Sequence, residues 1–307
     1  MKLRAVFSAA SIAPALIAAA LGLVCVMNPH RPLPYLIDIF SVPGLTFALV
    51  LAAALWAMRQ QPAQWIAAGA VLIFLLATWP QAFPLQAAAD RNSAPVRLVF
   101  ANLLIRNEHP EKILPWIAKE NPDIVALVEV NPFARDALIE SLKSDRPYIV
   151  TRYDMVIASR FPLTDTRRGA DGLSLLTTDV RAPGGDFVLA VAHLTRPWPF
   201  KPAQDQRGQF DRLDSTFAGL ADHRFVLAGD FNTPPCASGL GDFLRARRLH
   251  AAPALFGTWP SLLPGLLRVT IDNAMASKDL NLSRRAAGPF DGSDHRPIVV
   301  DIRPAKI

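Results

Sequence analysis

Residues 225–235 read FVLAGDFNTPP, an apolar run followed by a polar turn, and the other motifs of the chain are organised around this stretch. Its four apolar residues, 225–228, are typical of a short buried strand, and Gly229 allows the backbone to leave that strand sharply. Asp230 and Asn232 lie two positions apart, so an extended backbone sends both side chains the same way. A carboxylate and a carboxamide just beyond a strand are typical of the ligand-binding edge of an α/β sheet. The alternative is an Asx turn that only closes a core strand.

Other apolar runs of the chain have polar residues of the same kinds next to them. These are Asn102 after residues 96–101, Glu129 after 124–128, and Asp294 with His295 before 298–302. A carboxylate in such a place can hold a metal ion or orient an attacking water, and a neutral amide can bond a phosphate oxygen without repelling it. The pattern predicts that separate strands deliver these side chains to one site.

In chain order, the motifs resemble the endonuclease/exonuclease/phosphatase superfamily of metal-dependent phosphoesterases. The matching set is Asn102, Glu129, His193-Leu194, Gly229-Asp230-Phe231-Asn232, Ile271-Asp272 and Ser293-Asp294-His295. The resemblance covers about residues 95–304, and the order and spacing of the set make it specific as a whole. It implies a two-sheet α/β sandwich of the DNase I-like kind. The alternation of strand and helix signals after residue 96 favours the same fold class.

The resemblance also implies a divalent metal site. Glu129 and Asn102 match the family's metal-binding pair, and Asp294 would support the ion directly or through water. Oxygen ligands suit Mg²⁺ or Mn²⁺ rather than Zn²⁺, since the sequence has no cluster of Cys and His at zinc spacing.

Five further residues match catalytic positions of the family. His295 matches the histidine that acts as general base or stabilises the transition-state phosphate, and Asp272 would be its carboxylate partner. Asp230 and Asn232 would position the attacking water and the phosphate. His193 matches a second histidine that contacts the scissile phosphate or protonates the leaving oxygen.

The first 89 residues differ in kind from the rest. They contain few charged side chains, namely Lys2, Arg4, Arg31, Asp38 and Arg59. Three apolar stretches, 5–27, 35–58 and 65–83, each approach the ~20 residues that span a bilayer. We therefore expect a membrane anchor of three transmembrane helices in residues 1–88, a linker in 89–95 and a catalytic domain in 96–307. The first stretch is alternatively a secretory signal peptide.

Basic residues favour the cytoplasmic side of a membrane, which predicts the orientation of the anchor. Lys2, Arg4 and the amino terminus outweigh Arg31 in the first short loop, so the chain would begin in the cytoplasm. Three crossings then place everything after residue 83 outside it. We expect a multi-pass protein of the cell (inner) membrane with an extracytoplasmic catalytic domain, and Asp38 near the end of its stretch is expected to be an interfacial acid.

Charge and cysteine usage constrain the partners. The net charge is +6, and +3 remains for residues 90–307 once the four basic and one acidic side chains before them are removed. This mild excess is not a nucleic-acid signature, although it is compatible with an anionic substrate.

Cys25 and Cys236 are too far apart in their expected places for a disulfide, and Cys236 is expected to be a packed thiol. No obligate protein partner is implied.

A three-helix anchor joined to such a domain is similar to a bacterial subgroup associated with glycopeptide resistance and thought to act on lipid-linked phosphates. The expected function is a membrane-anchored, metal-dependent phosphoesterase that hydrolyses a phosphate mono- or diester, with a lipid-linked phosphate as the leading substrate. The alternatives are an extracytoplasmic DNA endonuclease or exonuclease, and a catalytically inactive binding module.

Overall fold

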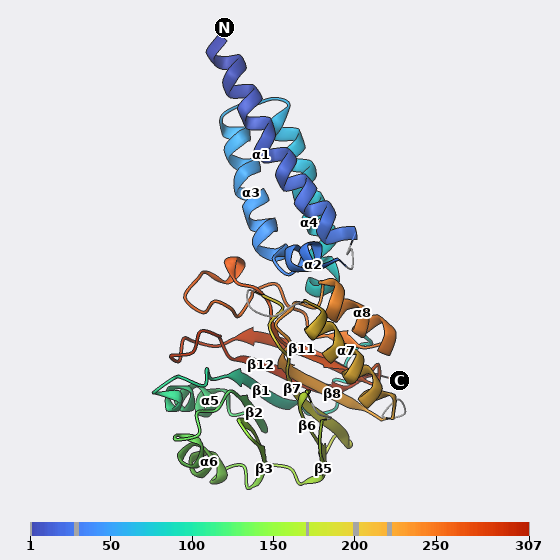
Figure 1. Ribbon diagram of the computed structural model, residues 1–307. Helices are drawn as coiled ribbons and strands as arrows, with labels where there is room; N and C mark the ends of the chain where they lie inside the picture. Colours follow the sequence, from blue (N-terminus) through green and yellow to red (C-terminus); the bar gives the residue numbers. More distant parts are fainter. Residues whose placement is uncertain (1, 28–30, 170–171, 199–202, 220–222, 307) are drawn as a thin grey trace.

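The computed structural model describes residues 2–27, 31–169, 172–198, 203–219 and 223–306. Two mixed six-stranded sheets pack face to face below a group of amino-terminal helices (Figure 1). In spatial order the first sheet contains β11 (Leu280–Ala287), β12 (Ile298–Pro304), β1 (Val96–Asn102), β2 (Ile124–Val128), β4 (Met155–Ser159) and β3 (Tyr148–Arg152). The second contains β5 (Leu163–Arg168), β6 (Ser174–Val180), β7 (Phe187–His193), β8 (Phe225–Asp230), β10 (Asp272–Ala276) and β9 (His250–Ala251). The predicted two-sheet α/β sandwich is confirmed.

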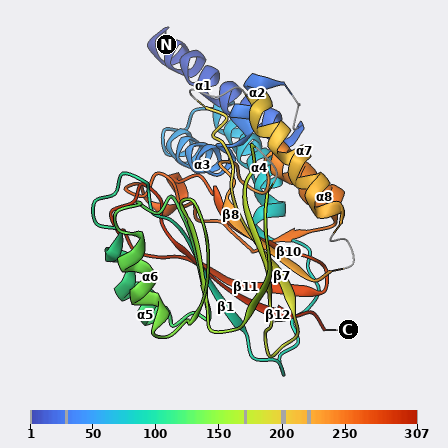
Figure 2. The ribbon, with the colours of Figure 1, turned by 60° about the horizontal axis from the view of Figure 1, so that its bottom comes forward.

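Helices cover the outer face of each sheet, as Figure 2 shows. The helices α5 (Leu114–Glu120) and α6 (Arg135–Lys143) pack on the first sheet, and α7 (Ala203–Ala218) and α8 (Ser238–Arg247) pack on the second. The central strands β2 and β8 are buried along their whole length, because one face contacts the other sheet and the other face contacts helices. That double burial explains why these strands read as continuous apolar runs.

The strand directions gather several strand ends at one edge of the sandwich. Each sheet has a parallel pair at its centre, β1 with β2 and β7 with β8, so the carboxyl ends of each pair lie together. The neighbours β12 and β10 run antiparallel to β1 and β8, which brings their amino ends to the same edge. Gly229 is required in β8 because a Cβ there would lie 2.3 Å from the Ala192 carbonyl oxygen of β7.

Some local expectations were wrong. The Asn131-Pro132 pair is typical of a helix cap followed by proline at the first helical position, yet α6 begins at Arg135. Asn131 Oδ1 accepts a hydrogen bond from the Phe133 amide at 2.9 Å, so the residue forms an Asx turn before the helix instead. The strands β3, β5, β9 and β11 were not foreseen; β5, with the sequence LTDTRR, is mostly exposed and has no apolar pattern.

The amino-terminal helices are α1 (Lys2–Met27), α2 (Pro32–Asp38), α3 (Ser41–Ala57) and α4 (Ala63–Ala82). Two of them contain stretches long and apolar enough to cross a membrane, Ala10–Met27 and Ala63–Ala82. The predicted helix over residues 35–58 is broken, because α2 and α3 meet at a bend of 66°. Counted as one bent span, that pair makes a third candidate.

Helix α2 lies against the two-sheet sandwich instead of pointing away from it. Asp38 is buried, and its Oδ2 accepts a hydrogen bond from the Ser238 amide of α8 at 2.8 Å. The Tyr35 hydroxyl donates to Gln206 Oε1 of α7 at 2.5 Å. Asp38 therefore has a partner that the sequence does not reveal.

The end of the predicted anchor and the start of the predicted linker are also bonded to the domain. Gln86 Nε2 donates a hydrogen bond to the Leu282 carbonyl of β11 at 3.0 Å, and Gln86 Oε1 accepts one from the Leu282 amide at 3.0 Å. The Asp90 amide donates to the Pro304 carbonyl of β12 at 2.9 Å. Residues 86–90 thus run along the edge of the first sheet. Cys25 and Cys236 are buried free thiols, as expected.

Replacing Tyr35 with phenylalanine is expected to destabilise the protein by about 1–3 kcal/mol, because the buried Gln206 Oε1 loses its donor. Thermal unfolding of the full-length chain in detergent should show Tm lowered by a few degrees. Tyr148→Phe is the matched control, because Tyr148 is 41% exposed in β3. Equal Tm values for the two variants would contradict the assignment of α2 as part of the folded domain.

Candidate functional site

A histidine and an aspartate form a buried pair at the edge where the strand ends meet. Asp272 begins β10 directly opposite Asp230 in β8, and His295 lies in the turn before β12. His295 Nδ1 lies 2.9 Å from Asp272 Oδ2, and both side chains are less than a tenth exposed. His295 Nε2, the other ring nitrogen, faces Asp230 Oδ2 at 3.8 Å. The carboxylate therefore fixes the ring so that Nε2 points into the site.

Asn102 joins the two sheets across this edge. From the end of β1, its Nδ2 donates to Glu129 Oε1 and to Asp230 Oδ2, each at 3.0 Å. Its Oδ1 accepts from the Leu104 amide at 2.9 Å, which fixes the side chain between the two carboxylates. Glu129 Oε2 accepts from the Ile105 amide at 3.1 Å. Asn102 thus holds the acid of one sheet beside the acid of the other.

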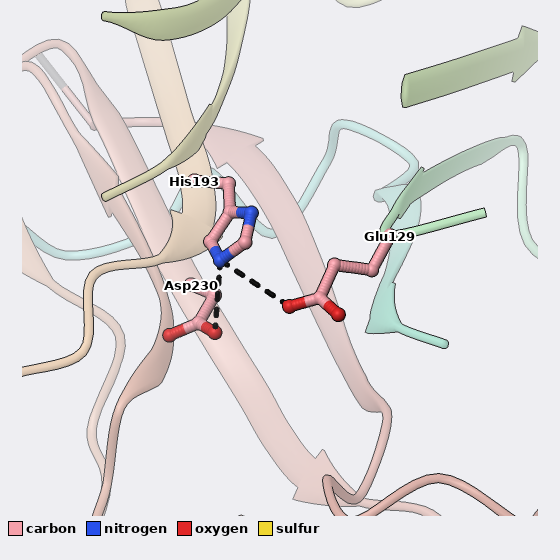
Figure 3. A group of neighbouring side chains, drawn as sticks. All are labelled: Glu129, His193 and Asp230. Carbon is pink, nitrogen blue, oxygen red and sulfur yellow. Dashed lines mark ion pairs between the residues drawn. The ribbon is translucent and has the colours of Figure 1, made fainter. Parts of the chain in front are cut away.

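His193 completes this group from the end of β7. Its Nε2 lies 3.4 Å from Glu129 Oε1 and 3.8 Å from Asp230 Oδ2 (Figure 3). The side chains of His193 and Glu129 are 24% and 21% exposed, while Asp230 is 1% exposed. His193 and Glu129 therefore form the solvent-facing side of the group and Asp230 its floor.

Asn232 and Asp294 lie beside this group with part of their bonding capacity already used. Asn232 Nδ2 donates to the Leu194 carbonyl at 2.9 Å, which ties the loop after β8 to the loop after β7. Asp294 Oδ2 accepts from Trp259 Nε1 at 3.1 Å, and its Oδ1 lies 3.9 Å from His295 Nε2. The structure brings all eight predicted site residues to one edge of the sandwich.

Two site residues have left-handed backbone conformations although neither is glycine. Glu129 has φ of 51° and Asn232 has φ of 51°. For a residue with a Cβ this conformation costs roughly 1–2 kcal/mol, so it persists only where neighbouring contacts enforce it. Seven other described residues that are not glycine share this conformation, so it does not by itself mark the site.

The charges of the site are strongly coupled. Burial raises the pKa of Asp230. Burial lowers the pKa of His295, but the nearby carboxylates of Asp272 and Asp230 outweigh that effect and raise it overall. Burial also raises the pKa of Glu129, yet His193 and the hydrogen bond from Asn102 leave it lowered. The arrangement therefore favours a protonated imidazole at His295 beside an ionised Glu129.

Several supporting residues were not foreseen from the sequence. The Ser293 hydroxyl donates to the Asn102 carbonyl at 2.8 Å, which joins the turn that carries His295 to the end of β1. Arg285 Nη2 donates to the Asp272 carbonyl at 2.8 Å, although the Arg284-Arg285 pair reads as a solvated face. Gln206 Nε2 donates to the Phe231 carbonyl at 2.9 Å. No sequence pattern marks these residues, because each acts through a contact distant along the chain.

The model of the Endonuclease/Exonuclease/phosphatase family matches residues 99–295, which is more than half of the chain. The chain belongs to this family. The match includes all eight predicted site residues and ends at His295. This family member is a phosphoester hydrolase with a candidate metal site at Asp230, Asp272 and His295.

Solved structures share the fold at low sequence identity. An endonuclease/exonuclease/phosphatase from Beutenbergia cavernae is 20% identical, with a TM-score of 0.55 over 69% of this chain and 72% of that one. The human Nocturnin catalytic domain is 20% identical, with a TM-score of 0.55 over 72% and 97% of the two chains. A beta toxin mutant from Staphylococcus aureus with bound magnesium ions is 14% identical, with a TM-score of 0.53 over 69% and 100%. Among proteins with curated descriptions, none matches this chain in sequence.

The donor atoms of this family member fit a divalent ion. One group of possible ligands is Glu129, His193 and Asp230, and the other is Asp230, Asp272 and His295; in each group the ligand atoms lie within 4.8 Å of one another. In addition, Asp272 Oδ1 and Asp294 Oδ1 are buried without a hydrogen-bond partner among the described residues. Buried carboxylate oxygens with free lone pairs are suited to a hard cation.

Proposed function

We propose that this protein is a membrane-anchored, divalent-metal-dependent phosphoesterase that hydrolyses a phosphate mono- or diester. The observation that carries the proposal is the convergence of Glu129, Asp230 and His295 from three strand ends on Asn102 and Asp272. Phosphoester cleavage depends chiefly on in-line geometry and on neutralising the charge of the phosphoryl oxygens, and these groups are placed for both tasks.

The metal would be Mg²⁺ or Mn²⁺, and Glu129 and Asp294 would hold it with Asn102 beside them. Asp294 Oδ1 is buried and free to accept, and Glu129 has a lowered pKa that keeps it ionised. Asn102 donates its amide to both carboxylates, so its contribution is to orient Glu129. A bound divalent ion would neutralise the charge on the phosphoryl oxygens. The magnesium-bound beta toxin with the same fold supports this choice of metal.

The side chains of the chain itself place the water and move the proton. His295 is oriented by Asp272 through Nδ1, so Nε2 is the atom that exchanges a proton in the site. Asp230, on the floor of the group, accepts from Asn232 N at 2.9 Å and positions the attacking water together with the Asn232 side chain. His193 Nε2 lies on the exposed side of the group, where it contacts the scissile phosphate or protonates the leaving oxygen.

A lipid-linked phosphate is the leading substrate. Candidate membrane spans directly precede the catalytic domain, so headgroup and carrier phosphates meet the site at high effective concentration. The excess of Lys2 and Arg4 over Arg31 supports an extracytoplasmic domain. The same combination of anchor and domain motivates the proposed likeness to the bacterial subgroup associated with glycopeptide resistance.

The proposal is tested by assaying the full-length protein in nanodiscs with Mg²⁺ against a lipid pyrophosphate, a soluble phosphodiester and plasmid DNA side by side. We expect the lipid pyrophosphate to be hydrolysed fastest. DNA cut at an equal or higher rate would favour the extracytoplasmic nuclease, and no hydrolysis of any substrate would favour the inactive binding module.

A further inference from the structure

The segment between β9 and β10 exposes an unusual number of large apolar side chains. We call residues 255–267 the apolar loop; its exposed members are Leu255, Phe256, Leu262, Leu263, Leu266 and Leu267. Leu262 is 80% exposed. Scattered exposed leucines are ordinary on a protein surface, but a contiguous group of this kind marks a surface that something else covers.

The apolar loop lies beside a helix of the amino-terminal group. Thr46 Oγ1 of α3 donates a hydrogen bond to the Leu266 carbonyl at 2.8 Å. Figure 1 shows this orange loop reaching upward to the lower end of α3. Helix α3 begins at Ser41, and each residue adds about 1.5 Å along its axis. Thr46 therefore lies about 7 Å from the start of the helix.

The length of α3 places this contact at membrane level. The helix has 17 residues and is about 25 Å long, whereas the hydrocarbon core of a bilayer is about 30 Å thick. Its far end is followed by the polar residues Arg59, Gln60 and Gln61, which belong at the opposite interface. With α3 as the membrane-spanning part of the bent pair, which rests on the proposed function, the membrane extends to the near end of α3 and Leu266 lies at the height of its first two turns.

Arginines lie at the base of the apolar loop. Arg296 Nε donates to the Ser261 carbonyl at 2.9 Å, and Arg285 Nη1 donates to the Phe256 carbonyl at 3.0 Å. Arg268 Nε donates to the Leu263 carbonyl at 2.5 Å. The Nε atom of Arg285 is buried below the loop, whereas Arg268 and Arg296 are half-buried beside the exposed apolar side chains. Basic and apolar side chains in this combination are typical of a segment that lies between anionic headgroups.

We propose that the apolar loop is a second membrane-binding element, inserted in the headgroup region of the leaflet next to the catalytic domain. Its base is tied to the site, because the Ser261 amide donates to the Asp294 carbonyl at 2.7 Å and the Ser261 hydroxyl to the Ser293 carbonyl at 2.8 Å. Contact with lipid thus holds the turn that carries His295 at headgroup height.

The test uses a polarity-sensitive fluorophore on the full-length protein in nanodiscs of phosphatidylcholine and phosphatidylglycerol. The label is attached at Leu262→Cys, with Tyr153→Cys as the control. Tyr153 is 79% exposed and lies in the turn between β3 and β4; β3 is an edge strand at the bottom of Figure 1, opposite the amino-terminal helices at the top. The native thiols at Cys25 and Cys236 are buried, and the labelled wild type gives their background.

Lipids that carry a nitroxide near the headgroup are expected to quench the label at position 262 several-fold more than the label at position 153, with a blue-shifted emission. Equal quenching at the two positions would overturn the proposal and would indicate that a protein partner or a second copy covers the loop. No substrate is present, so the result is independent of whether the protein hydrolyses phosphoesters.

Discussion

His295→Ala is expected to lower kcat by about 10³-fold or more, which corresponds to about 4 kcal/mol of transition-state stabilisation. The reason is that Nε2 of this residue is the ring nitrogen directed into the site, and Asp272 orients it at 2.9 Å from Nδ1. Asp272→Asn should also reduce kcat, because the amide no longer stabilises the charged imidazole. The measurement is steady-state hydrolysis of a soluble phosphodiester by the full-length protein with saturating Mg²⁺.

The chain offers a matched control for this pair of variants. His109 and Glu111 also form a histidine–carboxylate pair, with Nδ1 3.2 Å from Oε1, but both side chains are more than half exposed and lie outside the site. His109→Ala should keep the wild-type kcat. Far-ultraviolet circular dichroism and Tm values would show whether each variant is folded. A folded His295→Ala protein with wild-type turnover would refute the site assignment.

Removal of divalent metal with a chelator is expected to abolish hydrolysis, and Mg²⁺ or Mn²⁺ should restore it. Glu129→Gln should raise the Mg²⁺ concentration for half-maximal activity by about ten-fold or more, because it removes a carboxylate whose lowered pKa keeps it ionised. Direct Mn²⁺ binding, followed by electron paramagnetic resonance or by calorimetry, gives a readout that does not depend on turnover.

Glu140→Gln serves as the control for the metal experiment. Glu140 forms an exposed ion pair with Lys143 at 3.6 Å on α6. The substitution therefore removes one carboxylate charge, as Glu129→Gln does, but away from the site. Its metal dependence should equal that of the wild type. Unchanged Mn²⁺ affinity in Glu129→Gln would show that the ion is held elsewhere.

The sequence predicts the centre of this fold well because burial there is two-sided. A strand covered on both faces must be apolar throughout, so residues 124–128 and 225–228 stand out, and the polar residues after them mark the edge where ligands bind. The exposed strand β5 has no such constraint, and its polar sequence gave no signal. The bend between α2 and α3 also escaped prediction, since the apolar composition of residues 35–58 is the same for a straight helix and a broken one.

The supporting contacts of the site are the part that local pattern does not reveal. Asp38 meets the Ser238 amide 200 residues later in the chain, and Ser293 meets the Asn102 carbonyl 191 residues earlier. Trp259 is recognisable as an aromatic residue in a loop, but its bond to Asp294 follows only from the fold. Such pairs depend on the packing of whole elements, which one sequence does not determine.

The bonds from α2 to α7 and α8, and from residues 86–90 to β11 and β12, fix the catalytic domain at one height relative to the helices. With the helices in a bilayer and a lipid-linked phosphate as the substrate, as proposed, encounters come from lateral diffusion in the plane of the membrane. The rate of hydrolysis should then follow the number of substrate molecules per unit area of membrane.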